Sequence, residues 1–170
     1  DFADAVMLSA ETATGSYPLE AVRTMSDVIL AAETQCLHEP VDLQKHFIGS
    51  PIPYAVAMSV SESNQYCETE VIFAFTTTGF TAGLISNLFP PQPVIALTLD
   101  KKVMNQLSLY RSVYAVFLKQ PTSFDDMMNK VNAVSKQFRL ARKGDRVVVT
   151  GGAPFGSTAQ TNFMLFHEVG

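Results

Sequence analysis

The fold is decided by Val71-Ile72-Phe73-Ala74-Phe75-Thr76-Thr77-Thr78-Gly79-Phe80-Thr81. The first half of this stretch is an unbroken run of β-branched and aromatic residues, which is typical of a central strand covered on both faces. The second half is polar and contains a glycine, which indicates a loop that leads into a helix. A buried strand followed by a loop and a helix is the basic unit of a parallel sheet.

The rest of the chain after this stretch alternates helices with short apolar strands, as stacked βαβ units do. This pattern predicts a three-layer α/β/α fold with a mostly parallel five-stranded sheet whose last strand is antiparallel. Prolines at positions 90, 91 and 93 end one of the helices. We expect further strands at 94–98, 112–118, 146–150 and 162–169, and helices at 54–66, 81–89, 100–107 and from 123 to Gly144.

The last of these helices carries the clearest local signals. Ser123 followed by Asp126 resembles a capping box. Basic residues between 139 and 143 favour the negative end of a helix, and Gly144 is expected to close it. The apolar face is predicted to contain Phe124, Met128, Val131, Val134 and Phe138.

The start of the chain has a second buried-strand pattern, Ala5-Val6-Met7-Leu8. Such a strand needs neighbours on both sides, and its own following helix, from Ser16 and Pro18 to about Cys36, cannot supply them. The first residue is also Asp1 rather than Met, so we expect a piece of a longer protein. The patterns divide the chain into a βα unit at 1–37, a linker at 38–52 and an α/β domain at 53–170.

Composition excludes several classes of protein. A net charge of -4 and a pI near 5.3 argue against nucleic-acid binding, and no basic tract indicates a membrane surface. No apolar run approaches the roughly 18 residues that span a bilayer. Cys36 and Cys67 lack metal-ligand or redox spacing, so a reduced, cytoplasmic compartment is expected. His38, His46 and His167 also lack the spacing of a metal site.

Polar residues directly follow the first strand pattern. In α/β barrels the active site lies just past the C-terminal ends of the strands. Ser9 and Glu11 are therefore candidates to face a pocket. An ordinary helix-entry loop accounts for the same residues equally well.

Two further loops are candidate anion sites. Thr76, Thr77, Thr78, Gly79, Phe80 and Thr81 combine hydroxyls, a glycine and a helix start, which together favour a bound anion. The loop has no Lys or Arg of its own, and a helix cap with a polar loop is the alternative. The glycine-rich stretch 151–157 also follows a strand, and a flexible turn explains its glycines equally well.

The stretch Asp4-Ala5-Val6-Met7-Leu8-Ser9-Ala10-Glu11-Thr12-Ala13-Thr14-Gly15-Ser16-Tyr17-Pro18-Leu19-Glu20-Ala21-Val22 is similar to the segment that closes the catalytic TIM barrel of pyruvate kinases. It departs at Ala10, where the family usually has Gly, and at Thr14, where Lys is frequent. The later strands and helices match the family's order. The resemblance implies the last barrel βα unit at 1–37 and the C-terminal regulatory α/β domain, of bacterial type, at 53–170.

The resemblance also implies catalytic roles. Ser9, Glu11 and Thr12 would lie near phosphoenolpyruvate or pyruvate and help to relay a proton to the enolate. The parent enzyme would transfer a phosphoryl group from phosphoenolpyruvate to ADP in glycolysis, giving pyruvate and ATP, with Mg and K ions. We expect this piece alone to be inactive and to bind no metal, because the family's metal ligands and lysine belong to earlier barrel strands.

Regulation and assembly follow from the same resemblance. Residues 76–81 would bind the phosphate of an allosteric effector, and the second effector loop would contribute Gly152, Pro154, Gly156 and Ser157. Because this loop lacks the Trp- and Arg-bearing form that grips a bisphosphate, the expected effector is a sugar monophosphate or AMP. The expected partners are the rest of the chain and other copies in a homotetramer. A non-catalytic sensing module and a purely structural assembly domain stay open as alternatives.

Overall fold

The structure is a computed structural model that describes residues 3–35, 50–154 and 160–170. The chain divides into two compact units that separate between residues 41 and 42. Most of the predicted linker, residues 38–49, lies outside the described residues, and a helix has already begun at Ile52. Each unit is described by itself below.

The larger unit is built on a five-stranded sheet in the order β3-β2-β1-β4-β5. β1 pairs in parallel with both β2 and β4, and β2 pairs in parallel with β3. β5 runs antiparallel to β4. The predicted fold class is therefore confirmed. The strands are β1 (Ile72–Phe75), β2 (Val94–Thr98), β3 (Val113–Phe117), β4 (Arg146–Gly151) and β5 (Phe163–Glu168).

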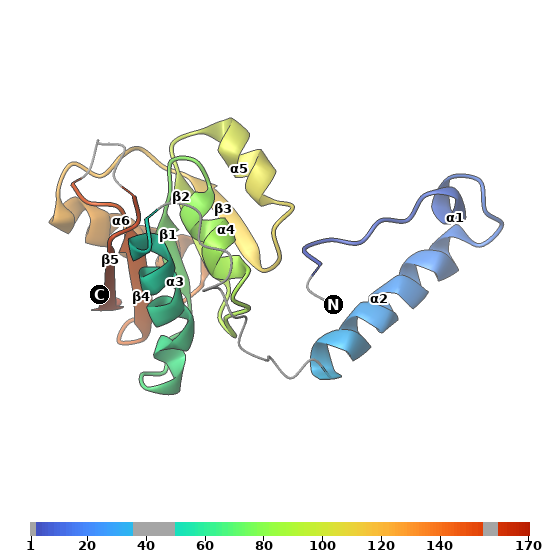
Figure 1. Cartoon of the computed structure of the whole chain (residues 1–170), viewed down its shortest axis with the longest axis horizontal. Helices are drawn as coiled ribbons and strands as arrows, with labels where there is room; N and C mark the ends of the chain where they lie inside the picture. The colour runs from blue at the N-terminus through green and yellow to red at the C-terminus, as the bar shows by residue number, and fades with distance from the viewer. Residues whose placement is uncertain (1–2, 36–49, 155–159) are drawn as a thin grey trace. The chain divides into compact units, whose positions relative to one another are not determined.

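Helices cover both faces of this sheet (Figure 1). The first hydrophobic cluster joins one face to α3, α4 and α5, and the second joins the opposite face to α6. A short 3₁₀ helix, η2, continues α3. Their bounds are α3 (Ile52–Glu62), η2 (Ser63–Gln65), α4 (Phe80–Ser86), α5 (Lys101–Leu107) and α6 (Phe124–Phe138).

The central strand β1 shows why its sequence is apolar without alternation. Successive side chains of a strand point to opposite faces, and both faces of this sheet are covered. Ile72 and Ala74 pack with α3, α4 and α5, whereas Phe73 packs with α6. All three side chains are fully buried.

The start of α6 is held by a reciprocal arrangement of side chains. The Ser123 hydroxyl accepts a hydrogen bond from the Asp126 amide at 3.1 Å. The Asp126 carboxylate accepts in turn from the Thr122 amide at 2.9 Å and from the Lys130 ammonium. These hydrogen bonds, that from Lys130 above all, lower the pKa of Asp126 below its usual value. The predicted cap at Ser123 is confirmed, with the return bond directed to Thr122.

Replacing Ser123 by alanine should lower the free energy of unfolding by about 1 kcal/mol, because the Asp126 amide loses its acceptor. Urea denaturation measures this loss. Ser108→Ala is the matched control, because the exposed Ser108 hydroxyl donates only to the Asn105 carbonyl and caps no amide. Its effect should stay within about 0.5 kcal/mol. Equal losses in the two variants would show that the cap is not the cause.

The predicted end of α6 is wrong. The helix stops at Phe138, and Arg139 takes the left-handed conformation with φ 54 at the C-cap. Gly144, with φ 91, instead shapes a later turn in which its amide donates to the Val169 carbonyl. The basic residues that favoured a longer helix lie in the connection to β4.

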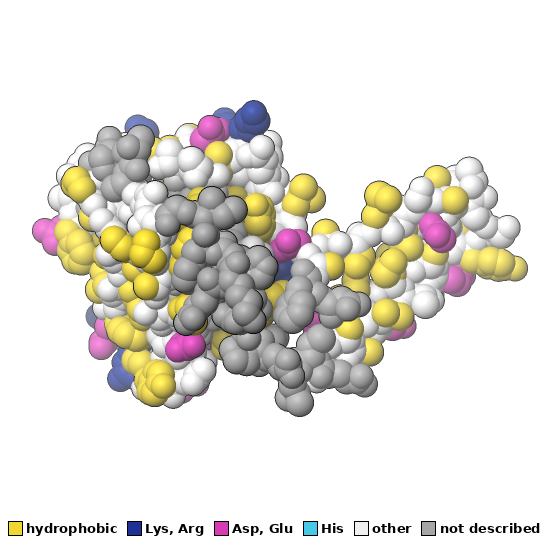
Figure 2. Space-filling model, viewed as in Figure 1, with side chains coloured by type: hydrophobic (Ala, Val, Ile, Leu, Met, Phe, Trp, Pro, Cys, Tyr) yellow, Lys and Arg dark blue, Asp and Glu magenta, His cyan; other side chains and the backbone are white. Residues whose placement is uncertain are grey.

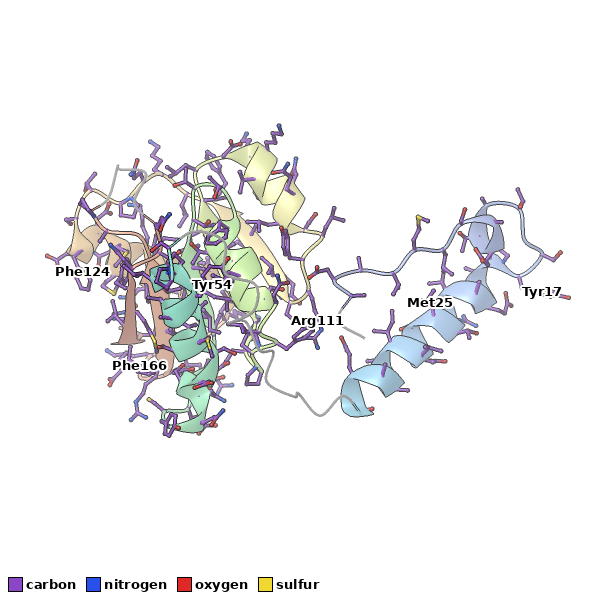
Figure 3. The ribbon with its side chains drawn as sticks, viewed as in Figure 1. Tyr17, Met25, Tyr54, Arg111, Phe124 and Phe166 are labelled. Carbon is purple, nitrogen blue, oxygen red and sulfur yellow. The ribbon has the colours of Figure 1, made fainter. Side chains whose placement is uncertain are left out.

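The predicted apolar face of α6 is correct only in its centre. Val131 and Val134 are buried, and Met127 replaces Met128 as the fully buried methionine. Phe124 and Phe138 are about half exposed because they are the first and last residues of the helix. Figure 3 shows the first of them, Phe124. The buried stripe is Met127, Val131, Val134 and Ser135, spaced as one face of a helix requires.

The smaller unit contains α1 (Ala10–Ala13) and α2 (Pro18–Gln35). The strand predicted at 5–8 does not form in the described residues, and Val6 and Met7 are exposed. A parallel strand exists only with hydrogen-bonded neighbours, and the described residues offer none to this segment. Pro18 begins α2 as predicted. Exposed apolar side chains, including Leu19, Val22 and Val28, lie along α2 (Figure 2).

Candidate functional site

The sheet order creates a switch point between β1 and β4. The chain leaves β1 through α4 toward β2 on one side, whereas β4 lies on the other side. In open α/β sheets ligands bind outside the carboxyl ends of the strands at such a point. The loops that follow Phe75 and Gly151 meet here. A Cβ added at Gly151 would lie 3.0 Å from the Phe75 Cβ, so a side chain here would crowd the end of β1.

The loop after β1 is ordered by its own hydroxyls. The Thr76 amide donates to the Leu97 carbonyl at 3.0 Å, and the Thr76 hydroxyl accepts from the Gly79 amide at 3.0 Å. The Thr78 hydroxyl accepts from the Phe80 amide at 3.4 Å. Gly79 takes φ 88, the left-handed conformation that favours glycine. These two hydrogen bonds are the contacts expected of the alternative interpretation, a helix cap with a polar loop.

Exposure divides the loop into a buried base and an open rim. Thr76 is buried, whereas Thr77 and Thr78 are exposed. The Phe80 ring meets the Tyr54 ring of α3 edge to face, with centroids 6.3 Å apart. Phe80 itself is half exposed. The rim of the loop thus combines exposed hydroxyl-bearing side chains with an aromatic surface.

Thr81, the last residue of the predicted loop, contacts a residue that sequence reasoning missed. Its Oγ1 lies 2.6 Å from the Oγ1 of Thr161, and both residues are buried. This hydrogen bond ties the first turn of α4 to the segment that leads into β5. The two residues are 80 positions apart. No local signal marks such a pair, because it forms only when β1 and β4 are neighbours.

The second loop is closed at its base by Asn162. The Asn162 side chain accepts from the Ala153 amide at 2.9 Å and donates to the Ala153 carbonyl at 2.7 Å. The Asn162 amide donates to the Gly151 carbonyl at 2.9 Å. Gly152 and Pro154 therefore lie at the mouth of the loop, next to this closure. The predicted residues Gly156 and Ser157 lie outside the described residues.

Basic residues occur at the same edge of the sheet. Lys101 and Lys102 follow β2, which lies beside β1, and Lys119 follows β3, which lies on the far side of β2. The Lys101 ammonium lies 5.6 Å from the centre of the Phe117 ring. The positive charge that the loop itself lacks is thus present on neighbouring strand ends.

The predicted catalytic residues of the smaller unit cluster around the start of α1. The Glu11 carboxylate accepts from the Ser9 amide at 2.9 Å, and the Thr12 hydroxyl donates to the Ser9 carbonyl at 3.3 Å. Backbone amides of Glu11 and Ser9 lower the pKa of Glu11 below its usual value. A Cβ at Gly15 would lie 2.5 Å from the Glu11 carbonyl oxygen, so the tight turn after α1 requires glycine. Ser9, Glu11 and Thr12 are brought together, in a local helix cap.

An open groove of about 1120 Å³ runs along the edge strand β3, away from the candidate anion site. It is lined largely by apolar residues such as Tyr114, Phe117 and Phe138 and contains none of the predicted site residues. Within residues 3–35, 50–154 and 160–170, no group of three or more His, Cys, Asp or Glu side chains could hold a metal ion. None of the described helices combines the length and hydropathy needed to cross a membrane.

A comparison with family models gives the assignment. The family model described as the pyruvate kinase alpha/beta domain matches residues 54–167. The chain belongs to the pyruvate kinase family. This match covers the sheet of the larger unit except the last residue of β5, together with both loops at its switch point, so the candidate anion site lies inside the α/β domain of a pyruvate kinase.

Individual pyruvate kinases match along the whole chain. The enzyme of Lactobacillus delbrueckii subsp. bulgaricus is 33% identical over 100% of this chain and 29% of its own length. That of Agrobacterium vitis is 34% identical over 100% of this chain and 36% of its own length. A crystal structure of a pyruvate kinase from Cryptosporidium parvum, 29% identical, matches with a TM-score of 0.75 over 97% of this chain and 33% of that chain. The chain thus spans about a third of the pyruvate kinases it matches.

Proposed function

We propose that this chain is the regulatory part of a pyruvate kinase and binds the phosphate of a small effector at the carboxyl edge of its sheet. The observation that carries the proposal is the meeting of two polar, glycine-containing loops at the switch point between β1 and β4. This is where open α/β sheets bind ligands. The protein as a whole would transfer a phosphoryl group from phosphoenolpyruvate to ADP in the cytoplasm.

The chemistry of the loops favours a phosphate. Thr77 and Thr78 present exposed hydroxyl-bearing side chains, and the amides of Thr81 and Ala82 have no acceptor within α4 because they belong to its first turn. These groups donate hydrogen bonds, which phosphate oxygens accept. Lys101 and Lys102, which follow β2, add positive charge at the same edge of the sheet. A single phosphate, as in a sugar monophosphate or AMP, matches one such set of donors.

For the catalytic reaction, Ser9, Glu11 and Thr12 are proposed to lie near the substrate in the complete enzyme. Two backbone amides lower the pKa of Glu11 and so make its carboxylate a weaker base, and the proposed relay therefore rests on the resemblance and on the clustering of these three residues. The complete enzyme would use the Mg and K ions of pyruvate kinases, for which the described residues offer no group of three or more His, Cys, Asp or Glu side chains.

Ligand binding tests the effector proposal. Thermal unfolding of the chain should shift to higher temperature with ribose 5-phosphate, glucose 6-phosphate or AMP, because a ligand that binds only the folded state stabilises it by mass action, by about 2.7 kcal/mol at a hundred times its Kd. Thr78→Ala should reduce the shift. Thr34→Ala is the control, because its hydroxyl bonds only to carbonyls of α2. No shift at millimolar ligand, or an unchanged shift in Thr78→Ala, would contradict the proposal.

A second role, subunit assembly, is favoured by the open edge of the sheet. β3 pairs only with β2 among the described residues, and Tyr114 and Phe117 of this strand are exposed. An edge strand with apolar side chains is a template for association. Analytical ultracentrifugation separates the two roles: association without any ligand response would favour assembly alone, and a monomer that responds to ligand would favour sensing.

A further inference from the structure

The end of β5 and the residues after it are attached to α6 through one side chain, that of Asn132. Its Oδ1 atom lies 2.8 Å from the Nε2 atom of His167 and accepts from the Gly170 amide at 3.3 Å. Val169, which lies between these two residues, is buried in the second hydrophobic cluster, beneath α6. We call the arrangement of His167, Asn132 and Gly170 the Asn132 clasp. It closes over a buried apolar side chain at the edge of the sheet.

The shared acceptor fixes where the proton of the imidazole lies. A backbone amide can only donate, so the Asn132 atom that faces Gly170 is the side-chain oxygen. A carbonyl oxygen can only accept, so His167 has to donate to it through a proton on Nε2. The only ring N–H of the neutral imidazole therefore lies in the clasp, and its Nδ1 atom carries no proton.

A second proton would place a positive charge on this partly buried ring, whose partner in the clasp is a neutral amide. Burial disfavours the charged form and lowers the pKa of His167 below its usual value. The negative charge of Glu168 raises the pKa, but by less. Glu168 is the next residue of the strand, so its side chain points to the opposite face of the sheet, and it lies opposite Arg146 in the register.

Charged groups on the neighbouring elements act in both directions. On α6, Lys136 lies one turn after Asn132 and disfavours a positive charge on the ring. In the turn before β4, the Asp145 carboxylate already accepts from the Arg142 amide at 2.6 Å. The carboxylate of Gly170, next to the clasp in this chain, acts in the opposite sense to Lys136. Burial of the ring remains the largest effect and sets the direction.

We propose that the Asn132 clasp is an acid-sensitive device: the neutral imidazole holds the end of β5 on α6, and a second proton on the ring moves it into water and releases Val169 from the core. The end of an edge strand can open at a lower cost than the whole domain, so the response is local. This inference does not depend on the proposed effector function, because the clasp lies at the opposite end of β5 from the candidate loops.

The sign of the pH dependence follows from the direction of the pKa shift. The folded protein binds the second proton less readily than the unfolded chain, in which the pKa of histidine is about 6.5. The stability that the neutral ring contributes is therefore fully present above this pH. It is lost as the pH falls through the lower pKa of His167 in the folded protein.

Nuclear magnetic resonance of the full chain from roughly pH 8 to pH 5 tests the device. The amides of Val169 and Gly144 report the closed clasp, because they donate to the Asp145 and Val169 carbonyls at 2.9 and 2.8 Å. Their protection from hydrogen exchange, corrected for the intrinsic exchange rate at each pH, should fall several-fold as the His167 ring becomes protonated. The ring signal is assigned by its loss in His167→Gln.

Two variants of the clasp should change this response in different ways. His167→Gln keeps an N–H donor for Asn132 but cannot gain a proton, so the protection should no longer depend on pH. Asn132→Asp gives the ring a carboxylate partner, so protonation should strengthen the clasp and the protection should rise as the pH falls. Asn129→Asp is the matched control, because it makes the same change one turn earlier on α6, where the side chain is exposed. It should keep the wild-type fall.

The outcomes separate the device from a general effect of acid. Constant protection of Val169 and Gly144 while the His167 ring titrates would overturn the proposal. A fall that persists in His167→Gln would overturn it as well, and this variant decides the question if Asn132→Asp does not fold. The third contrary result is a fall in Asn132→Asp as large as that in Asn129→Asp.

Discussion

Replacing Phe73 by alanine should lower the free energy of unfolding by about 3–5 kcal/mol, the cost of emptying a large, fully buried site. Phe73 lies on the central strand β1, between β2 and β4, and packs in one cluster with Met127 and Val131 of α6. Neighbouring strands hold the backbone in place, so the cavity cannot collapse. Because small domains are stable by only about 5–15 kcal/mol, this variant should unfold at much lower urea concentration.

Phe166→Ala is the matched control for this prediction. Phe166 is also a phenylalanine on a strand of the same sheet, but it lies on the edge strand β5 and is 44% exposed (Figure 3). Its loss should stay near 1 kcal/mol. Urea denaturation at equal protein concentration measures both variants, and an unchanged slope with denaturant shows that stability alone has changed. Similar losses in the two variants would contradict the central place of Phe73 in the core.

Gly79→Ala should have the largest effect on ligand binding among single changes of the β1 loop. The residue has φ 88, a conformation that costs a residue with a Cβ about 1–2 kcal/mol. The added Cβ would also lie 3.2 Å from the Leu107 Cδ2 and 3.4 Å from the Val103 Cγ1. The backbone of the loop has to move to relieve the strain at position 79 and the close contacts of the added Cβ. We therefore expect a lower free energy of unfolding and loss of the thermal shift with ribose 5-phosphate.

Gly144→Ala separates conformational strain from the effect on the loop. Gly144 has nearly the same conformation, φ 91, yet no atom lies within 4 Å of a Cβ built there. Gly144→Ala should be destabilised only by the conformational strain and should keep the full thermal shift with ligand. Thermal unfolding with and without ribose 5-phosphate compares the two. A ligand response retained in Gly79→Ala would mean that the β1 loop does not position the effector.

Local sequence signals were sufficient to predict the boundaries of the short elements β2 and α5 in the larger unit. β2 matches its predicted range, and α5 begins after Asp100, whose carboxylate accepts from the Lys102 amide at 2.7 Å. In both cases the boundary is set by a neighbouring residue: a proline before the strand and an acidic cap before the helix. Such signals involve only residues that are adjacent in the sequence, so they can be recognised without knowledge of the fold.

Two predictions about secondary structure were wrong, those for the end of α6 and for the strand at 5–8. The C-terminal end of α6 was placed by charges and by Gly144, but Arg139 itself adopts the left-handed cap, a role that is usually glycine's. The strand expected at 5–8 depends on neighbours that the described residues do not contain. Apolar pattern alone cannot supply hydrogen-bonded partners.

The candidate site was predictable in its parts and not in its assembly. Both loops were identified because each follows a strand and contains glycine and hydroxyl-bearing residues. Their meeting depends on the placement of β4 beside β1, which the order of elements in the sequence does not specify. Thr161 and Asn162 were missed for the same reason, since their importance lies in contacts with Thr81 and Ala153. The roles proposed for the predicted site residues stay predictions.

The position of β1 between β2 and β4 also sets the order in which the protein can be completed during synthesis. β2 follows β1 closely and can pair with it early, but the other edge of β1 has to wait for Val148 and its neighbours. Until these emerge from the ribosome, the nascent chain carries a bare, wholly apolar strand edge, the kind of surface that recruits other chains into aggregates. The same pairing that brings the two candidate loops together therefore ends the period in which the growing chain needs protection from its neighbours.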